Sequence, residues 1–89
     1  MIRSFNGKSP VISDTAYIDE MASVIGDVEL DESVNLWPGA VLRGDINKIV
    51  VGRDTNVQDN ATIHTQHDAI TNIGCCVTIG HNAVVHGCT

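Results

Sequence analysis

Four histidines in one segment of the chain are the residues best suited to chemistry. The segment reads IHTQHDAITNIGCCVTIGHNAVVHG and contains His64, His67, His81 and His86, which are all the histidines of the 89 residues. Imidazole nitrogens bind divalent metals, and they exchange protons near neutral pH. The valines, isoleucines and glycines around them are a poor setting for a solvated polar loop. Whether the four side chains form one site depends on the elements that position them.

A six-residue hydrophobic period runs through the chain and limits where the histidines can lie. The period is carried by Ile12, Ile18, Val24, Leu30, Leu36 and Leu42, then by Val51, Val57 and Ile63, and then by Ile73, Ile79 and Val85. An α-helix requires a period of about 3.6 and a simple strand a period of about two, so neither explains this pattern. A parallel β-helix does, because each short strand turns a corner and the chain returns one coil higher.

Three hexapeptides close one triangular coil, so the apolar markers fall into three columns. The first column holds Ile12, Leu30, Val51 and Ile73, the second Ile18, Leu36, Val57 and Ile79, and the third Val24, Leu42, Ile63 and Val85. Insertions of three and four residues both fall between the third column and the first, so we expect them at the same edge. Gly26, Gly52, Gly74 and Gly80 follow or nearly follow markers, where tight corners need permissive backbone. The sequence therefore predicts an all-β chain, a single β-helix domain over residues 1–89 with about four coils.

The columns place two of the histidines next to each other. His64 follows Ile63 and His86 follows Val85, so the two hold equivalent positions on adjacent coils, and Arg43 lies one coil below. Stacked strands lie about 4.8 Å apart, which allows two imidazoles to share a metal with bonds of about 2.0–2.1 Å. The alternative is a pair of histidines that stack on a solvated face without a ligand.

His81 belongs to another column and stacks over Asp59. A corner separates His81 from the His64 and His86 pair, so we do not expect one ion to take all three from a single chain. A trimer with cyclic symmetry solves this, because a neighbouring subunit can supply His81. Three histidine nitrogens with an open fourth position are typical of catalytic zinc, whereas structural zinc sites are closed by four protein ligands.

The net charge and the cysteine content limit which partners and which cellular compartment we expect for the protein. The net charge is −6, so we expect no nucleic-acid or anionic-membrane partner, and neither a signal peptide nor a membrane span stands out. The cysteines Cys75, Cys76 and Cys88 form neither an even framework nor a CxxC pair. We therefore expect reduced thiols in a cytoplasmic protein, although the sequence assigns no role to them.

Three motifs resemble the gamma-class carbonic anhydrase family of hexapeptide-repeat proteins. They are RGD at Arg43–Asp45, NVQDNATIH at Asn56–His64 and TIGHNAVVHG at Thr78–Gly87, and GDVEL at Gly26–Leu30 is similar to the early coils of the family. The resemblance implies a left-handed β-helix, whereas the repeat spacing leaves the handedness open. It also implies a homotrimer with metal sites shared between subunits.

Carried over residue by residue, the resemblance makes His64, His81 and His86 the metal ligands, with His81 supplied across the subunit interface. Arg43 and Asp59 match the intersubunit ion pair of the family next to the metal. The metal is expected to be Zn²⁺, although imidazole also binds Fe²⁺ and Co²⁺ and availability decides between them.

The same resemblance implies reversible hydration of CO₂ to bicarbonate, a lyase reaction in which a metal-bound hydroxide attacks the carbon. Gln58 matches the residue that hydrogen-bonds the metal-bound water, and Asn56 in the same motif supports it. Asp45 matches an acidic residue at the interface with a structural role.

The chain departs from the family pattern after the first metal histidine. The best-studied members carry an acidic loop with a glutamate proton shuttle there, whereas this chain has TQHDAITN with His67 at the corresponding position. An imidazole has an ordinary pKa of about 6.5, so His67 can act as the shuttle. The alternative is that His67 is an exposed loop histidine without a role. The later coils and capping helix of the family are also missing, so we interpret the chain as the N-terminal half of a longer fold, or as an unusually short form that relies on self-association. Two other functions stay open, a non-catalytic metal-binding trimer and a hexapeptide-type acyltransferase.

Overall fold

The computed structural model of the protein describes residues 1–89, which form eleven short strands and no helix. The strands are β1 (Ile2–Arg3), β2 (Val11–Ile12), β3 (Tyr17–Ile18), β4 (Ser23–Leu30), β5 (Asn35–Leu36), β6 (Val41–Val51), β7 (Asn56–Val57), β8 (Thr62–His64), β9 (Thr71–Ile73), β10 (Thr78–Ile79) and β11 (Val84–His86). Nothing in the chain has the helical length and hydropathy that a membrane span requires.

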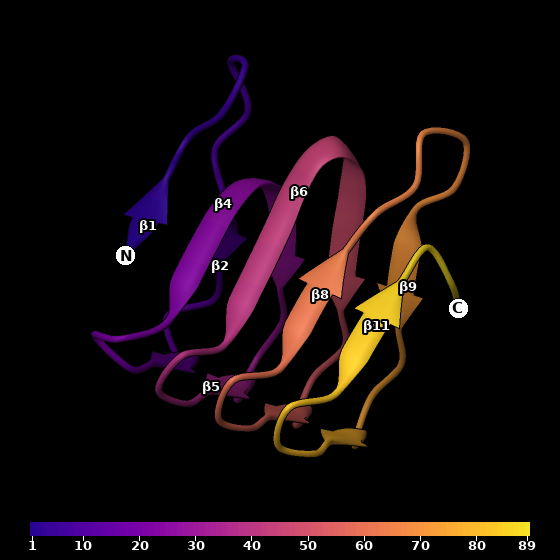
Figure 1. The fold of residues 1–89 in the computed structure, drawn as a ribbon. Helices are drawn as coiled ribbons and strands as arrows, with labels where there is room; N and C mark the ends of the chain where they lie inside the picture. Colours follow the sequence, from indigo (N-terminus) through magenta and orange to yellow (C-terminus); the bar gives the residue numbers. More distant parts are fainter.

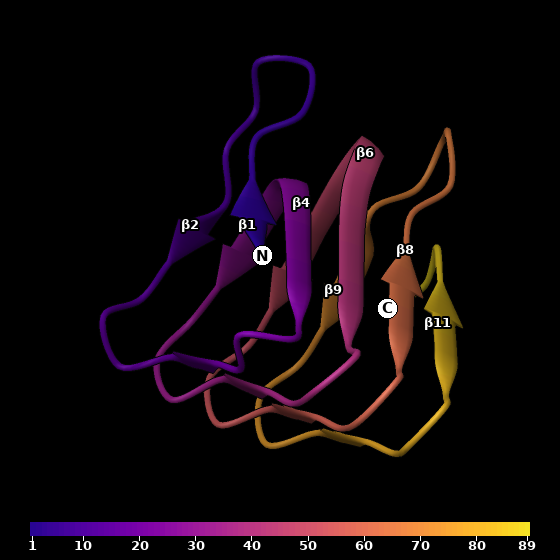
Figure 2. The same ribbon diagram turned by 60° about the vertical axis from the view of Figure 1, so that its left-hand side comes forward.

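The strands form a parallel β-helix with three faces. Face A contains β1, β8, β11 and the first halves of β4 and β6, and face B contains β2, β9 and the second halves of β4 and β6. Face C contains β3, β5, β7 and β10. Figure 2 shows β1, β4, β6, β8 and β11 side by side on face A. In Figure 1 each coil rises on the near side, crosses at the top and descends on the far side while the coils advance from left to right. That path makes the helix left-handed, as the family resemblance implied.

The strand register confirms all three predicted columns. On face B, Ile12 pairs with Leu30, Leu30 with Val51 and Val51 with Ile73. The second column pairs in the same way from Ile18 to Ile79 on face C. The third column pairs from Val24 to Val85 on face A. The hexapeptide spacing therefore gave the correct register for every coil.

Small branched side chains fill the interior, as the low aromatic content requires. Leu36, Leu42, Ile63 and other column members are fully buried. Ile49 is also fully buried although it lies outside the columns, because the bend of β6 returns the chain so that Ile49 pairs with Val28. Stacked branched side chains suit this narrow core, since each coil repeats the same space.

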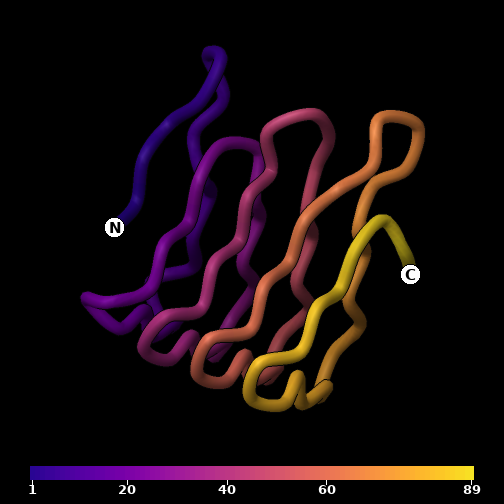
Figure 3. The backbone as a smooth tube through the Cα atoms, in the orientation of Figure 1, coloured from indigo at the N-terminus to yellow at the C-terminus, as the bar shows by residue number.

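Both insertions lie at the edge between faces A and B, as predicted. Residues 45–48 form the bend within β6, and residues 65–70 form the loop between β8 and β9. The turn near Phe5 and Lys8 projects from the same edge (Figure 3). This edge is therefore the irregular one, while faces B and C meet in tight two-residue turns.

The corner glycines corrected one expectation. Only Gly26 of the four has a left-handed backbone, with φ of 80°, and a Cβ on it would meet the Gly44 carbonyl oxygen at 2.3 Å. The prediction of permissive backbone at Gly52, Gly74 and Gly80 was wrong. The other left-handed corner positions are occupied by Gly39 and by the non-glycine residues Ser33, Asp54, Asn60, Cys76 and Asn82. Short polar side chains tolerate this region better than most because they can hydrogen-bond locally.

Candidate metal centre

His64 and His86 lie side by side on the outer surface of face A. They pair in register on β8 and β11, while their neighbours Ile63 and Val85 belong to the apolar column. The two imidazole rings stack with centroids 5.2 Å apart and planes 8° apart. The predicted adjacency is therefore present, and Arg43 lies next to His64 in the same ladder.

Hydrogen bonds fix the orientation of both rings. Nε2 of His64 lies 2.8 Å from Oδ1 of Asp45, and Nε2 of His86 donates to the Thr65 carbonyl oxygen at 3.0 Å. A carbonyl only accepts, so His86 carries its proton on Nε2 and its lone pair on Nδ1. Metal-bound histidines usually donate their other N–H to a carboxylate or a carbonyl, which orients the ring. Two imidazoles held in this way fit a divalent metal, which His64 and His86 would help to hold.

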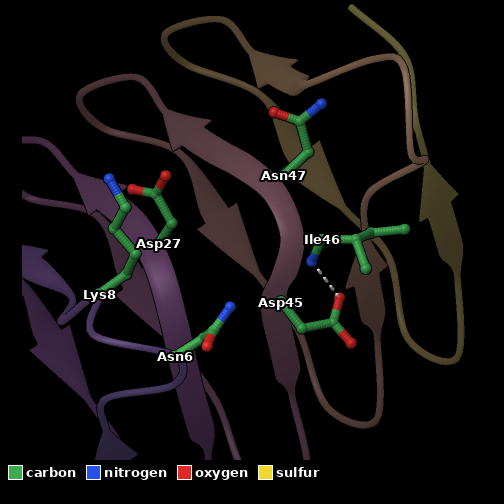
Figure 4. A pocket seen from close by; sticks show the side chains of 6 residues that line it. All are labelled: Asn6, Lys8, Asp27, Asp45, Ile46 and Asn47. Atoms are coloured by element: carbon green, nitrogen blue, oxygen red, sulfur yellow. Dashed lines mark hydrogen bonds between the residues drawn. The ribbon is translucent and has the colours of Figure 1, made fainter.

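Asp45 connects His64 to Arg43. Its Oδ2 accepts a hydrogen bond from Nη1 of Arg43 at 2.9 Å, and the backbone N–H of Ile46 donates to Oδ1 at 2.8 Å (Figure 4). Burial by itself raises the pKa of the Asp45 carboxyl, but the hydrogen bond from His64, the Ile46 N–H and the Arg43 charge together lower the pKa below its ordinary value. Asp45 is therefore a carboxylate that accepts from His64, so the proton of this ring is also on Nε2.

His81 lies in the turn after β10, on a different side of the coil from the stacked pair. Its Nδ1 is 3.4 Å from Oδ1 of Asp59, which confirms the predicted stacking of the two residues. Both side chains are exposed, at 65% and 49%. Within the chain, no three His, Cys, Asp or Glu side chains are grouped to hold a metal ion. A site with three histidines therefore requires a second chain.

Arg43 and Asp59 do not meet within the chain. Arg43 bonds to Asp45 and its side chain is 51% exposed, whereas Asp59 faces His81. Their predicted pairing across an interface stays a prediction, because a single chain contains no subunit interface.

Asn56 and Gln58 have different surroundings. The Asn56 amide donates to Asn35 Oδ1 on face C, and the same oxygen accepts from Nε1 of Trp37 at 2.7 Å. The Trp37 ring lies against Tyr17, with centroids 5.1 Å apart. Asn56 is therefore part of a polar and aromatic row on face C. The Gln58 side chain is half-buried in the turn after β7 and has no hydrogen-bond partner in the chain, so its amide is available to a ligand.

His67 lies at the tip of the loop between β8 and β9. A bridge between Gln66 and Ala69 closes this loop, and the His67 side chain is exposed without a hydrogen-bond partner. The loop starts directly after His64 and Thr65, at the A and B edge that also carries Asp45. The structure therefore places His67 apart from the three ligand candidates, on the loop where the resemblance expects the proton shuttle.

Sequence reasoning missed Thr71, which holds the backbone of the site together. The side chain of Thr71 is fully buried, and its hydroxyl donates to the His64 carbonyl oxygen at 2.7 Å. The same hydroxyl accepts from the Gly87 N–H at 2.9 Å, next to His86. A lone threonine gave no sequence signal, because the contact depends on segments of two coils meeting at one edge.

A pocket of about 220 Å³ adjoins the site at the A and B edge (Figure 4). Its lining consists of Asn6, Lys8, Asp27, Asp45, Ile46 and Asn47. Asp45 is the residue it shares with the histidine cluster, and none of the histidines lines it. The pocket therefore adjoins the candidate centre through the Asp45 carboxylate alone.

The fold and its register define a left-handed β-helix of hexapeptide repeats. No family profile matches the chain. The chain is 47% identical over 88 residues to the mitochondrial gamma carbonic anhydrase 2 of Arabidopsis thaliana, which covers 92% of this chain and 32% of that protein. It is 41% identical over 78 residues to the probable carbonic anhydrase of Methanocaldococcus jannaschii, covering 88% of this chain and 49% of that protein.

Solved structures agree on the fold. A hexapeptide transferase family protein from Anaplasma phagocytophilum has a TM-score of 0.95 and 45% identity, over 100% of this chain and 52% of that one. A putative acetyltransferase from Bacillus cereus has a TM-score of 0.96 and 33% identity, over 99% of this chain and 51% of that one. With these relatives and motifs, the chain belongs to the gamma-class carbonic anhydrase family. It spans about a third to a half of the length of the relatives it matches.

Proposed function

We propose that the chain takes part in the reversible hydration of CO₂ to bicarbonate at metal sites shared between the subunits of a homotrimer. The observation that carries this proposal is the stacked pair of His64 and His86, with His81 on another side of the same coil. Two ligands from one subunit and His81 from a neighbour would complete a three-histidine site. Relatives named as carbonic anhydrases support the same chemistry.

A divalent metal held by three histidines lowers the pKa of a coordinated water to about 7, which supplies a nucleophile at neutral pH. Zn²⁺ suits this donor set best, and Fe²⁺ or Co²⁺ is the alternative. The part of the chain in this proposal is to hold the ligands. Asp45 and the Thr65 carbonyl hold the two rings on face A, and Asp59 lies beside the third.

Other side chains would act on the substrate and on protons. The unpaired amide of Gln58 would orient the nucleophile and hold negative charge that develops on oxygen. His67 would accept and release protons from its exposed position on the loop. Asn56 would act indirectly, since its amide is held by Asn35 on face C.

The trimer would also pair charges that are exposed in one chain. Arg43 and Asp59 are each about half exposed, at 51% and 49% of their side chains, on the two sides that would meet. An ion pair between them would bring His81 of one subunit to the stacked pair of the next. The cytoplasmic location is a further prediction, based on cysteines without a disulfide partner.

The test is a comparison of CO₂ hydration and bound metal for the native chain and His81→Ala. We expect both metal content and hydration rate to fall severely in His81→Ala, because the third ligand is lost. The exposed Glu20→Gln is the control and should keep both. In His67→Ala the metal should stay, and the lost hydration rate should return with imidazole buffer. Full metal occupancy in His81→Ala would refute the shared site.

The names of the two structural neighbours favour a second candidate, transfer of an acyl group. Turnover of acetyl-coenzyme A by the native chain in the presence of a metal chelator would support this candidate over hydration. A chain that binds metal at the histidines but neither hydrates CO₂ nor transfers an acyl group would instead be a metal-binding trimer without catalysis.

A further inference from the structure

Two adjacent cysteines occupy the corner between faces B and C. Cys75 and Cys76 form the two-residue turn between β9 and β10, and both side chains are exposed and free of disulfides. This turn stacks on the turn of the coil below, because the Cys76 N–H donates to the Arg53 carbonyl oxygen at 2.9 Å. The thiols therefore project to solvent from a position fixed by the repeat.

Cys76 has a backbone conformation that its side chain does not favour. Its φ is 58°, and the equivalent corner residues of the two coils below, Ser33 and Asp54, have φ of 56° and 59°. Serine and aspartate can compensate in the left-handed region with local hydrogen bonds, as Asp54 does with an ion pair to Arg53 at 3.2 Å. A thiol is a weak hydrogen-bonding group and gains little of this kind. The repeat therefore imposes the left-handed conformation at this corner, and it fixes the backbone from which the Cys76 thiol projects.

One buried hydroxyl holds both ends of the cysteine turn. Thr55 is fully buried, and its Oγ1 donates to the Gly74 carbonyl oxygen at 2.8 Å. The same oxygen accepts from the Val77 N–H at 3.2 Å. Gly74 and Val77 directly flank the two cysteines, so the turn is clamped from inside the helix while its thiols remain accessible.

The two thiols also interact with each other. A hydrogen bond to Cys75, followed by the charge of Cys75, raises the pKa of the Cys76 thiol above its ordinary value. The two thiols sit on adjacent residues of one two-residue turn, and both are exposed, so one ion can reach both of them. Cys88 is exposed as well but belongs to the segment after β11.

We propose that Cys75 and Cys76 form a two-sulfur binding site for thiophilic metal and metalloid ions, of which trivalent arsenic is the defining class. Both thiols are preset on one rigid turn, so little conformational freedom is lost when they bind one ion. This site lies at the corner between faces B and C, away from the A and B edge, and contains none of the histidines.

Phenylarsine oxide is the probe, because one trivalent arsenic takes two thiols. Two As–S bonds form, the As–O bond breaks, and the two thiol protons leave with the oxygen as one water. No oxidant or reductant is needed. Intact-mass measurement of the native chain with an equimolar amount should show one phenylarsenic group, and a maleimide added afterwards should label one thiol per chain, that of Cys88.

Matched variants assign the adduct. Cys75→Ser and Cys76→Ser should each bind the probe at least about tenfold more weakly, because a single remaining thiol cannot chelate the arsenic. Cys88→Ser has the same loss of one exposed thiol and should bind as the native chain does. Thr55→Val keeps both thiols but releases the turn, and it should bind more weakly than the native chain with its circular dichroism spectrum retained.

The opposite pattern would overturn the proposal. Equal affinity for the probe in the native chain and Cys75→Ser would mean that single thiols react independently. Loss of the adduct in Cys88→Ser would place the site elsewhere. An unchanged affinity in Thr55→Val would contradict the claim that the Thr55 hydroxyl holds the turn in its binding conformation. Circular dichroism of every variant separates loss of binding from loss of fold.

Discussion

At the scale of single residues, Asp45 has more contacts to the candidate centre than any other carboxylate. It accepts from His64, from Arg43 and from the Ile46 N–H, and its side chain is only 14% exposed. The motif match gave it a structural role at an interface. The geometry adds a direct contact with a ligand candidate, which makes Asp45 the residue that orients the His64 ring.

Asp45→Asn tests this orienting role. The amide keeps the size of the side chain but removes the negative charge of the group that accepts the hydrogen bond from His64. The metal affinity should therefore fall about 10- to 100-fold. Metal-binding titration followed by calorimetry measures the affinity. Asp68→Asn, on the exposed loop beside His67, is the control and should leave the affinity unchanged. Native affinity in Asp45→Asn would show that the contact does not support the site.

At the scale of elements, two buried threonines form hydrogen bonds between neighbouring coils, whereas the residues of the hydrophobic columns contact each other only by apolar packing. Thr55 and Thr71 are fully buried, and each hydroxyl bonds to two backbone groups of neighbouring segments. Thr55 holds the cysteine turn, and Thr71 holds the strands that carry His64 and His86. A polar group in a narrow apolar core is stable because both of its hydrogen-bonding capacities are used.

Thr71→Val should destabilise the β-helix by about 1–3 kcal/mol, because the near-isosteric valine leaves the His64 carbonyl without its partner. Urea denaturation at one fixed protein concentration measures the free energy of unfolding. Thr78→Val is the control, since Thr78 is exposed on β10 and should change stability by less than about 0.5 kcal/mol. Equal losses in the two variants would mean that the hydroxyl bonds of Thr71 add nothing.

At the scale of the whole molecule, the candidate centre is divided between two sides of a rigid prism. His64 and His86 lie on face A, and His81 lies in the turn that leads from face C toward it. The stacked coils cannot bend to bring these sides together, because backbone hydrogen bonds fix each face. Under the proposed function, a complete site would be built by an assembly with cyclic symmetry, in which each interface is formed by two different surfaces.

Mixing two inactive variants tests this assembly. Subunits with His64→Ala keep His81, and subunits with His81→Ala keep the pair on face A. After unfolding and joint refolding in equal amounts, the whole mixture should recover about one quarter of the native hydration rate, because about three quarters of the trimers are mixed and each of these has one intact site out of three. Either variant refolded alone is the control and should stay inactive. No recovery in mixtures that sediment as trimers would contradict the shared site.

The sequence by itself determined the coil number, the register and the adjacency of His64 and His86. A six-residue period leaves one solution for which side chains stack, since a shift of one residue would turn the apolar column outward. The same reasoning placed His81 over Asp59. These features depend only on spacing along the chain.

Only the tertiary structure decided the contacts that cross the corners. The bond from Asp45 to His64, the clamps of Thr55 and Thr71, and the left-handed backbone at Cys76 depend on how bends and turns approach each other in space. Those approaches are set by backbone dihedral angles and hydrogen bonds at each corner, which a hydrophobic period does not encode. The hydrophobic period of the segment thus predicted which residues lie next to the histidines. The hydrogen bonds that orient the His64 and His86 rings were visible only in the folded structure.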